Sequence, residues 1–128
     1  MNSRVKLKQI NTLSRFSLAF ILIYQGLIPK ILWLDDTELL LVELHLFQYP
    51  AQVISLVAGI FEVLLGLIIV FFKTSKLILY FTILLFSLLL IDVALVQPQL
   101  FIKAFNPITI NISSIALSFT ALFSSSKY

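Results

Sequence analysis

The sequence predicts an all-α integral membrane protein: a bundle of four membrane-spanning helices, with a short interfacial or re-entrant helix between the first and the second. Of the 128 residues, 60% are hydrophobic and only 12% are charged. A soluble domain has about a quarter of its residues charged, and so small a chain has too little interior to bury this apolar excess. We therefore expect a single transmembrane domain over residues 1–128 whose surface mostly faces the lipid bilayer.

The first span is expected over about residues 12–34. A basic segment precedes the apolar run that begins at Phe16, and no small-residue cleavage site follows it, so this run is interpreted as an uncleaved helix rather than a signal peptide. Pro29 lies inside the span. Because proline lacks a backbone N–H, it should kink or end the helix there.

The segment from residue 34 to 50 is too short and too acidic to cross a membrane. Asp35, Asp36 or Thr37 can cap a helix that begins here, because these side chains accept hydrogen bonds from free N–H groups. We expect a short helix at the membrane surface, with His45 as an interfacial polar residue.

The other three spans are expected at about 51–72, 76–97 and 107–123, each near the twenty or so residues that cross a bilayer. Pro50 opens the second span and Pro98 ends the third. Asn106 followed by Pro107 is a strong start signal for the fourth, with asparagine as the N-cap and proline at the first helical position.

The cationic residues predict the orientation. With a cytoplasmic N-terminus, seven of the nine lysines and arginines lie on the cytoplasmic side, which is the asymmetry of the positive-inside rule. These are Arg4, Lys6, Lys8, Arg15, Lys73, Lys76 and Lys127, against Lys30 and Lys103 outside. Both termini are therefore expected in the cytoplasm.

One polar side chain at least is expected in the outer half or at the midplane of each span. The predicted membrane-embedded cluster comprises Gln25, Lys30, Glu62, Asp92 and Asn111. An acid held in the membrane is costly and points to function, whereas the amides can equally serve as interhelical contacts. For Asp92 and Lys30 the alternative is contact with the interface, which a lysine reaches by extending its side chain.

Glu62 shares one helix face with Gly59 and Gly66, because the three are spaced i, i+3 and i+7. Small residues let a neighbouring helix approach, so this face should pack against protein. Lys30 is the one cation in plausible reach of Glu62, but it is expected to start about ten residues of helical rise above it. Without that contact, Glu62 should be protonated and hydrogen-bonded to Gln25, Tyr24 or Asn111.

Composition limits the chemistry of the chain. It contains no cysteine and one histidine, so it cannot by itself supply a thiolate, an Fe–S cluster or a multi-histidine metal site, and no metal site is expected. The basic residues lie at helix ends rather than on one polar face, which argues against a nucleic-acid partner.

Several short segments, taken together, resemble the DoxX-like family of small bacterial membrane proteins. They are QGLIPK (25–30), a following Glu38, FEVLLG (61–66) and FNPITIN (105–111). The motif positions are Gly26, Pro29, Lys30, Glu38, Glu62, Gly66, Asn106 and Pro107. The resemblance implies a four-helix protein of the bacterial plasma membrane, and some members resemble small subunits of quinone-linked oxidoreductases.

Three functional hypotheses remain open. The first is an accessory or quinone-interacting subunit of a membrane redox system, with quinone as the candidate cofactor and a separate redox protein or a homo-oligomer as partner. The second is a non-catalytic scaffold or assembly factor. The third, a small transporter subunit that uses Glu62, is disfavoured because the inner half of the bundle offers no continuous polar path. Whether the chain belongs to an enzyme stays undecided.

Overall fold

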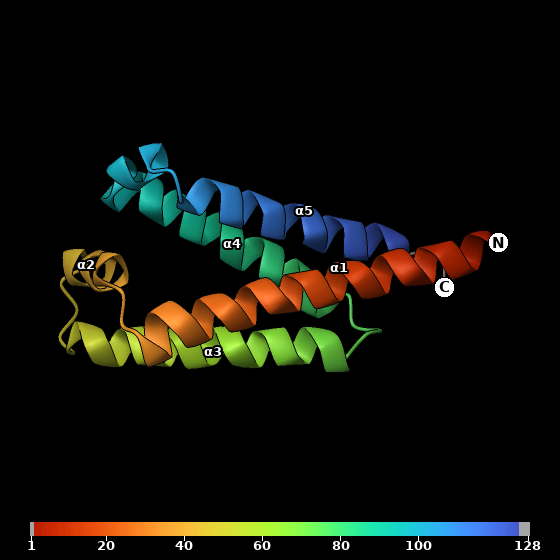
Figure 1. Cartoon of the computed structure of the whole chain (residues 1–128), viewed down its shortest axis with the longest axis horizontal. Helices are drawn as coiled ribbons and strands as arrows, with labels where there is room; N and C mark the ends of the chain where they lie inside the picture. Colours follow the sequence, from red (N-terminus) through yellow and green to blue (C-terminus); the bar gives the residue numbers. More distant parts are fainter. Residues whose placement is uncertain (1, 126–128) are drawn as a thin grey trace.

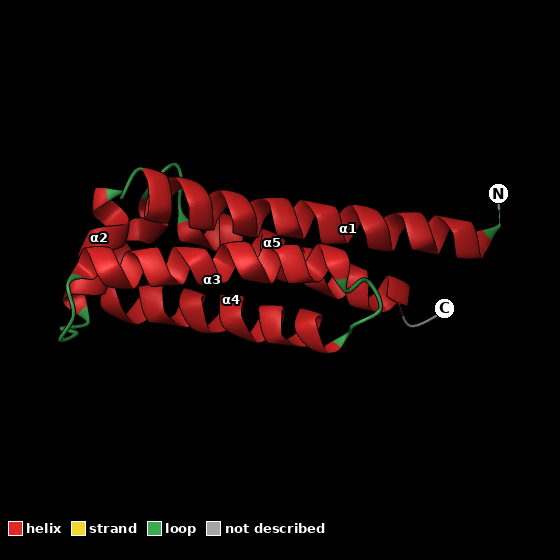
Figure 2. Ribbon diagram, turned by 90° about the horizontal axis from the view of Figure 1, so that it is seen from below, coloured by secondary structure: helices red, strands yellow, loops and turns green. Residues whose placement is uncertain are grey.

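The computed structural model describes residues 2–125, and the elements within that range are all helices (Figures 1 and 2). Four segments of this range are long and apolar enough to cross a membrane: α1 with its continuation η1 (Ser3–Leu32), α3 (Ala51–Phe71), α4 (Leu77–Val96) and α5 (Pro107–Ser125). The short helix α2 (Asp36–Leu44) lies between the first two and crosses one end of the bundle. The predicted fold class is confirmed.

The first span differs from expectation at both ends. Helix α1 (Ser3–Gly26) begins well before residue 12, because the side chain of Asn2 caps it by accepting a hydrogen bond from the Arg4 N–H at 3.2 Å. At Pro29 the helix widens instead of ending: η1 (Leu27–Leu32) is a π-helix. Proline has no N–H for the regular ladder, and the Trp33 N–H instead reaches the carbonyl of Ile28 at 2.9 Å.

The predicted starts of α2 and α5 are confirmed. The Asp35 side chain caps α2 by accepting from the Thr37 N–H at 3.0 Å, and Asn106 caps α5 by accepting from the Thr109 N–H at 3.2 Å. Between α4 and α5 lies a short 3-10 helix, η2 (Pro98–Ile102). Its Leu100 is 5% exposed, so apolar burial explains why this segment is ordered.

The helices are closely packed at one end of the bundle and diverge toward the other (Figure 1). Helix α1 packs against α3 and α5, and α5 packs against α4, whereas α3 and α4 meet in few places. At the open end, α2 contacts both α3 and α4. We call this end the α2 end. The opposite end, where α1 begins and α5 finishes, is the terminal end.

The core is apolar, and so is the outward surface. Leucine, isoleucine and phenylalanine side chains from all four long helices form one buried cluster, which includes Leu18, Leu65, Phe86 and Leu122. Large apolar side chains also point outward along the helices; Phe20 is 67% exposed and Leu95 is 79% exposed. A surface of this kind is matched to lipid rather than to water, so the chain is a multi-pass membrane protein.

A buried arginine ties the terminal end together. Arg15 is 1% exposed, and its guanidinium donates to the backbone oxygens of Ile69 at 3.3 Å and Ser75 at 2.9 Å. Asn11 accepts from Arg15 Nε and donates its own amide to the Ala121 carbonyl at 2.7 Å. The bonds from Arg15 satisfy carbonyls in the last turn of α3 and in the turn that follows it, where a cation also complements the helix dipole. The sequence alone identifies Arg15 only as one of the cations expected on the cytoplasmic side. Lys127, another of these cations, lies outside the described residues.

The glycines mark the closest helix contact. A Cβ atom on Gly26 would lie 2.5 Å from the carbonyl oxygen of Gly59, and one on Gly59 would lie 2.6 Å from the carbonyl oxygen of Gly26. Gly66 faces Ile23 and the backbone of Ala19. The prediction that Gly59 and Gly66 lie against another helix is confirmed: the helix is α1.

Replacement of Gly59 by alanine should lower the free energy of unfolding by roughly 1–3 kcal/mol, because the new methyl group must push two backbones apart. Gly66→Ala is the comparison: its Cβ would lie 2.8 Å from the Ile23 side chain and 3.0 Å from the Ala19 carbonyl oxygen, against 2.6 Å from the Gly26 carbonyl oxygen at Gly59, so its loss of stability should be smaller. Thermal unfolding in one detergent, followed by circular dichroism, compares the two. Equal stability of the two variants would contradict a backbone contact at Gly59.

Candidate functional site

An ion pair lies where α1 and α3 approach most closely. Nζ of Lys30, on η1, is 2.5 Å from Oε1 of Glu62, on α3. Lys30 follows Gly26 by about one helical turn, and Glu62 follows Gly59 in the same way. Because α1 and α3 run in opposite directions, this contact sets Lys30 beside Gly59 and Glu62 beside Gly26, and the long lysine side chain spans the turn between them to reach the acid.

The expectation that Lys30 starts far above Glu62 is wrong. It places Lys30 at the outer end of the first span and Glu62 about eleven residues down the second, whereas the contact between Gly26 and Gly59 sets the end of the first span beside the middle of α3. The end of this span therefore meets α3 at Glu62 rather than at the start of α3. Among the described residues, the ammonium of Lys30 takes the place of the neutral hydrogen-bond partner expected for Glu62.

Helix α2 adds a second carboxylate to the pair. Oε2 of Glu38 lies 3.8 Å from Nζ of Lys30, so the ammonium stands between two acids. Burial raises the pKa of Glu38 above its ordinary value, and the charge of Lys30 opposes this rise. Glu38 lies in the first turn of α2, and its N–H donates to the capping side chain of Asp35, so the capped turn that starts α2 also brings Glu38 to Lys30.

An apolar groove runs between α3 and α4, the two long helices that meet in few places. Its volume is about 600 Å³, and Glu62 is the one acid in its lining. The rest of the lining is almost entirely apolar: Tyr49, Val53, Ile54, Val57, Ala58, Phe61, Leu85 and Leu89. Val57 is 60% exposed and Phe61 45% exposed, so the groove opens on the lipid-facing side of the bundle.

The two carboxylate oxygens of Glu62 differ in their contacts. The residue is 8% exposed, Oε1 contacts Lys30, and Oε2 is buried without a hydrogen-bond partner among the described residues. A buried acceptor without a partner costs free energy, and such an atom beside a groove is suited to accept a hydrogen bond from a bound molecule. In the described part of the chain, the hydroxyl of Ser55, one turn from Gly59 on α3, is the other buried side-chain polar atom without a hydrogen-bond partner.

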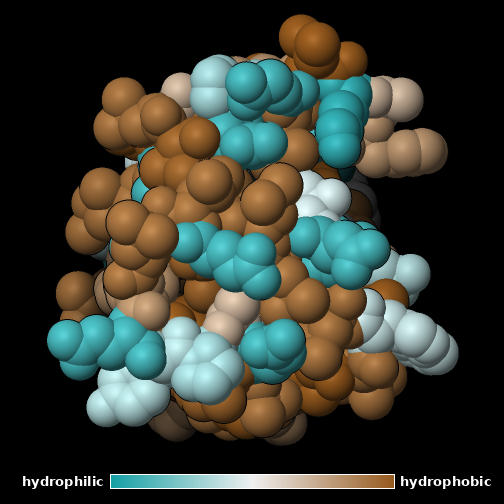
Figure 3. Space-filling view, turned by 90° about the vertical axis from the view of Figure 1, so that its left-hand side faces the viewer, coloured by the Kyte–Doolittle hydropathy of each residue, from teal (hydrophilic) through white to brown (hydrophobic). Residues whose placement is uncertain are grey.

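A second cavity, of about 360 Å³, opens at the α2 end. Glu62 and Leu89 line both this cavity and the groove. Its walls carry charged and amide side chains, among them Lys30, Glu38, Lys103, Gln25 and Asn111. The surface at this end is mixed, with hydrophilic side chains between hydrophobic ones (Figure 3).

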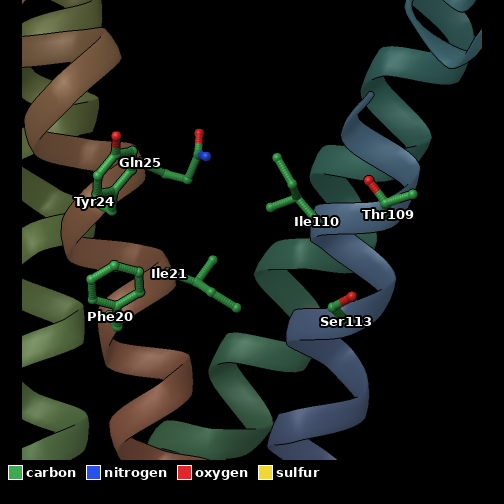
Figure 4. A pocket seen from close by; sticks show the side chains of 7 residues that line it. All are labelled: Phe20, Ile21, Tyr24, Gln25, Thr109, Ile110 and Ser113. Carbon is green, nitrogen blue, oxygen red and sulfur yellow. The ribbon is translucent and has the colours of Figure 1, made fainter. Parts of the chain in front are cut away.

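A smaller pocket of about 290 Å³ lies between α1 and α5. Gln25 and Ile21 of α1 extend toward Ile110 of α5, with Thr109 and Ser113 beside it (Figure 4). Gln25 and Ile110 also line the cavity at the α2 end, so this pocket is its neighbour on the side away from the groove.

Four of the five predicted cluster residues meet at the α2-end cavity: Gln25, Lys30, Glu62 and Asn111. The motif residues Pro29, Glu38, Asn106 and Pro107 line it too, while Gly26 and Gly59 form the helix contact beside it. Gly66 lies two turns of α3 farther toward the terminal end. Asp92 does not join the cluster. The groove-lining side chains were not singled out from the sequence, because apolar residues on a membrane helix give no signal of a cavity.

Asp92 instead holds the end of α2. Its Oδ1 lies 2.8 Å from Nε2 of His45, and the Leu41 carbonyl lies 2.6 Å from Nδ1 of the same ring. The hydrogen bond to Asp92, followed by that to Leu41, raises the pKa of His45, because both ring nitrogens can donate only in the imidazolium. The next residue, Leu46, has a φ of 54°, a strained conformation for leucine that this contact helps to hold.

The fold and site define a small multi-pass membrane protein with a buried ion pair between its first two spans. A family model described as the DoxX-like family matches residues 19–119. The chain belongs to this family, as its motifs predicted. No curated protein and no solved structure matches it.

The His45–Asp92 contact should make stability depend on pH. Because the pKa of His45 is raised in the folded state, the stabilisation is fully present below the ordinary value of about 6.5 and is lost as the pH rises through the folded value. Asp92→Asn should flatten the fall in melting temperature above about pH 6.5, and Asp36→Asn, an exposed acid on α2, should leave it unchanged. An equal fall in wild type and Asp92→Asn would rule the contact out as its source.

Proposed function

We propose that this protein is an accessory subunit of a membrane redox system that binds a membrane quinol in the groove between α3 and α4. The observation that carries the proposal is the free oxygen of Glu62 beside an apolar groove that opens toward lipid. The volume of about 600 Å³ lies within the range of about 300–1,000 Å³ that is usual for small-molecule sites.

The chemistry of the free oxygen selects the form of the ligand. A carboxylate paired with an ammonium accepts hydrogen bonds and has none to donate. The polar head of the ligand must therefore carry an O–H, as a hydroquinone does and an oxidised quinone does not. The last torsion of glutamate is broad, so a small rotation of Glu62 brings Oε2 to the groove while Oε1 keeps Lys30.

The shape of the groove fits the remainder of a quinol. Phe61 and Tyr49 offer aromatic surfaces for the ring, and the aliphatic side chains of Val53, Val57 and Leu85 are suited to an isoprenoid tail. Because the groove opens on a lipid-facing side, the tail can remain in the bilayer. The electron acceptor is assigned to a separate redox protein, in keeping with a chain that contains no cysteine and one histidine.

The same proposal includes the placement of the chain as one transmembrane domain in the bacterial plasma membrane. Arg4, Lys6, Lys8, Lys73 and Lys76 lie toward the terminal end, and Lys30 and Lys103 toward the α2 end. By the positive-inside rule, the terminal end is cytoplasmic. The α2 end then faces the outside.

Binding of a short-tailed hydroquinone to the purified chain in lipid nanodiscs tests this function, with the dimethyl ether of the same compound as the matched ligand. The ether keeps the ring and the tail but has no hydrogen to donate. Because a hydrogen bond to a charged group contributes about 1.5–3 kcal/mol, the hydroquinone should bind roughly 10- to 100-fold more tightly. Equal affinities would overturn the proposal.

Two variants locate the site. Glu62→Leu should remove the preference for the hydroquinone, and Ala58→Phe should block the groove to both ligands without touching the ion pair. Ser55→Ala is the control, since it removes the other unpartnered buried oxygen of α3 and does not line the groove. Unchanged binding in both Glu62→Leu and Ala58→Phe would place the ligand elsewhere.

A further inference from the structure

Glu62 lies at the boundary between two cavities of opposite character. On one side is the apolar groove between α3 and α4; on the other is the cavity at the α2 end, and Glu62 and Leu89 line both. A carboxylate in this position can exchange a proton with a molecule in the groove on one side and with water on the other.

The α2-end cavity has the lining of an aqueous site. Five charged side chains face it: Lys30 from η1, Asp35 and Glu38 from the start of α2, Glu62 from α3, and Lys103 after η2. Amide groups of Gln25, Asn106 and Asn111 complete its polar wall. Charged groups inside a membrane protein face protein partners or water-filled cavities rather than lipid, and Lys103 and Asp35 are on the exposed rim of this one.

The α2-end cavity does not continue past Glu62 toward the terminal end. Toward the terminal end the interior is the apolar cluster that includes Leu18, Leu22, Leu65 and Ile69, each at most 3% exposed. The serines of α5 that continue the line of Asn111 do not open a path, because Ser114 and Ser118 are fully buried and donate to backbone carbonyls of their own helix. The cavity therefore reaches Glu62 from one end only.

We propose that the α2-end cavity is a water-filled half-channel through which Glu62 exchanges protons with the aqueous phase at the α2 end alone. It rests on the proposed function in one respect: the molecule in the groove is the one that gives the proton. In that step the O–H bond of the ligand breaks, an O–H bond forms at Oε2 of Glu62, and the ligand keeps the electron pair as an anion. The proton then passes to water in the half-channel.

Single cysteines test the half-channel, because the chain has none of its own. The reporters are Asn111→Cys on α5 and Val93→Cys on α4, which both line the cavity. The controls are Ser118→Cys and Thr82→Cys, which lie on the same two helices and are 0% exposed in the native protein. Leu46→Cys and Ser3→Cys, at exposed positions of the α2 end and the terminal end, mark the two sides of sealed vesicles.

A membrane-impermeant cationic methanethiosulfonate reagent is added to one side of the vesicles at a time, and labelling is read by mass spectrometry. Both reporters should be modified from the side that labels Leu46→Cys and from no other, and both controls should stay unmodified. If neither reporter reacts from that side in protein with native helicity, or if the controls react as well, the half-channel is excluded. Two reporters on different helices keep the test decisive if one variant does not fold.

The labelling experiment needs no quinol, so its outcome is independent of the ligand. Labelled reporters together with equal binding of the hydroquinone and its dimethyl ether would leave the half-channel standing and refute the quinol. Unlabelled reporters together with selective binding of the hydroquinone would refute the half-channel and leave the quinol site standing.

Discussion

The ion pair of Lys30 and Glu62 is the interaction on which the rest of the α2 end depends. Transfer of two charges from water into an apolar bundle costs several kcal/mol per ion, and only close contact and further hydrogen bonds offset it. The structure supplies the contact at 2.5 Å and a second acid, Glu38, but Oε2 of Glu62 has no hydrogen-bond partner within residues 2–125. Because a buried acceptor without a partner costs free energy, the pair stabilises the fold less than a fully hydrogen-bonded pair would.

The backbone around the pair is shaped to make it. Gly26 and Gly59 let α1 and α3 touch, and Pro29 widens the end of the first span into a π-helix that carries Lys30. Such π-helical turns occur often at functional sites. At the terminal end, Arg15 and Asn11 bind α1 to α3 and α5 through backbone carbonyls. At the terminal end, the helices are thus joined by hydrogen bonds to neutral backbone carbonyls. At the α2 end, they diverge around the charged side chains of Lys30, Glu38 and Glu62.

Features that depend on local sequence could be predicted. The four spans follow from runs of apolar residues, the start of α5 from Asn106 and Pro107, and the packed face of α3 from the spacing of Gly59 and Gly66. These signals come from one helix at a time, and hydrophobicity, capping and helical period decide them.

Features that depend on how helices slide past one another could not be predicted. The depth of Lys30 relative to Glu62 is one of these features, because the backbone contact between Gly26 and Gly59 sets how far α1 is shifted along α3. The burial of Arg15 is another, because its partners are backbone carbonyls at and just after the end of α3, and a backbone carbonyl is present at every residue whatever its side chain. Asp92 was placed in the cluster by its depth alone, whereas its direction around α4 brings it to His45.

Infrared spectroscopy of the carboxyl groups tests the central claim, that Glu62 is a carboxylate paired with Lys30. Wild-type protein at neutral pH should show a carboxylate band that is missing from the spectrum of Glu62→Gln. In Lys30→Met this band should shift, because the ammonium that contacts the carboxylate is lost. Lys103→Met, which removes a cation from the rim of the same cavity, should leave it in place. A protonated C=O band that disappears in Glu62→Gln would show instead that the acid is neutral, and would contradict the ion pair and the acceptor role assigned to its free oxygen.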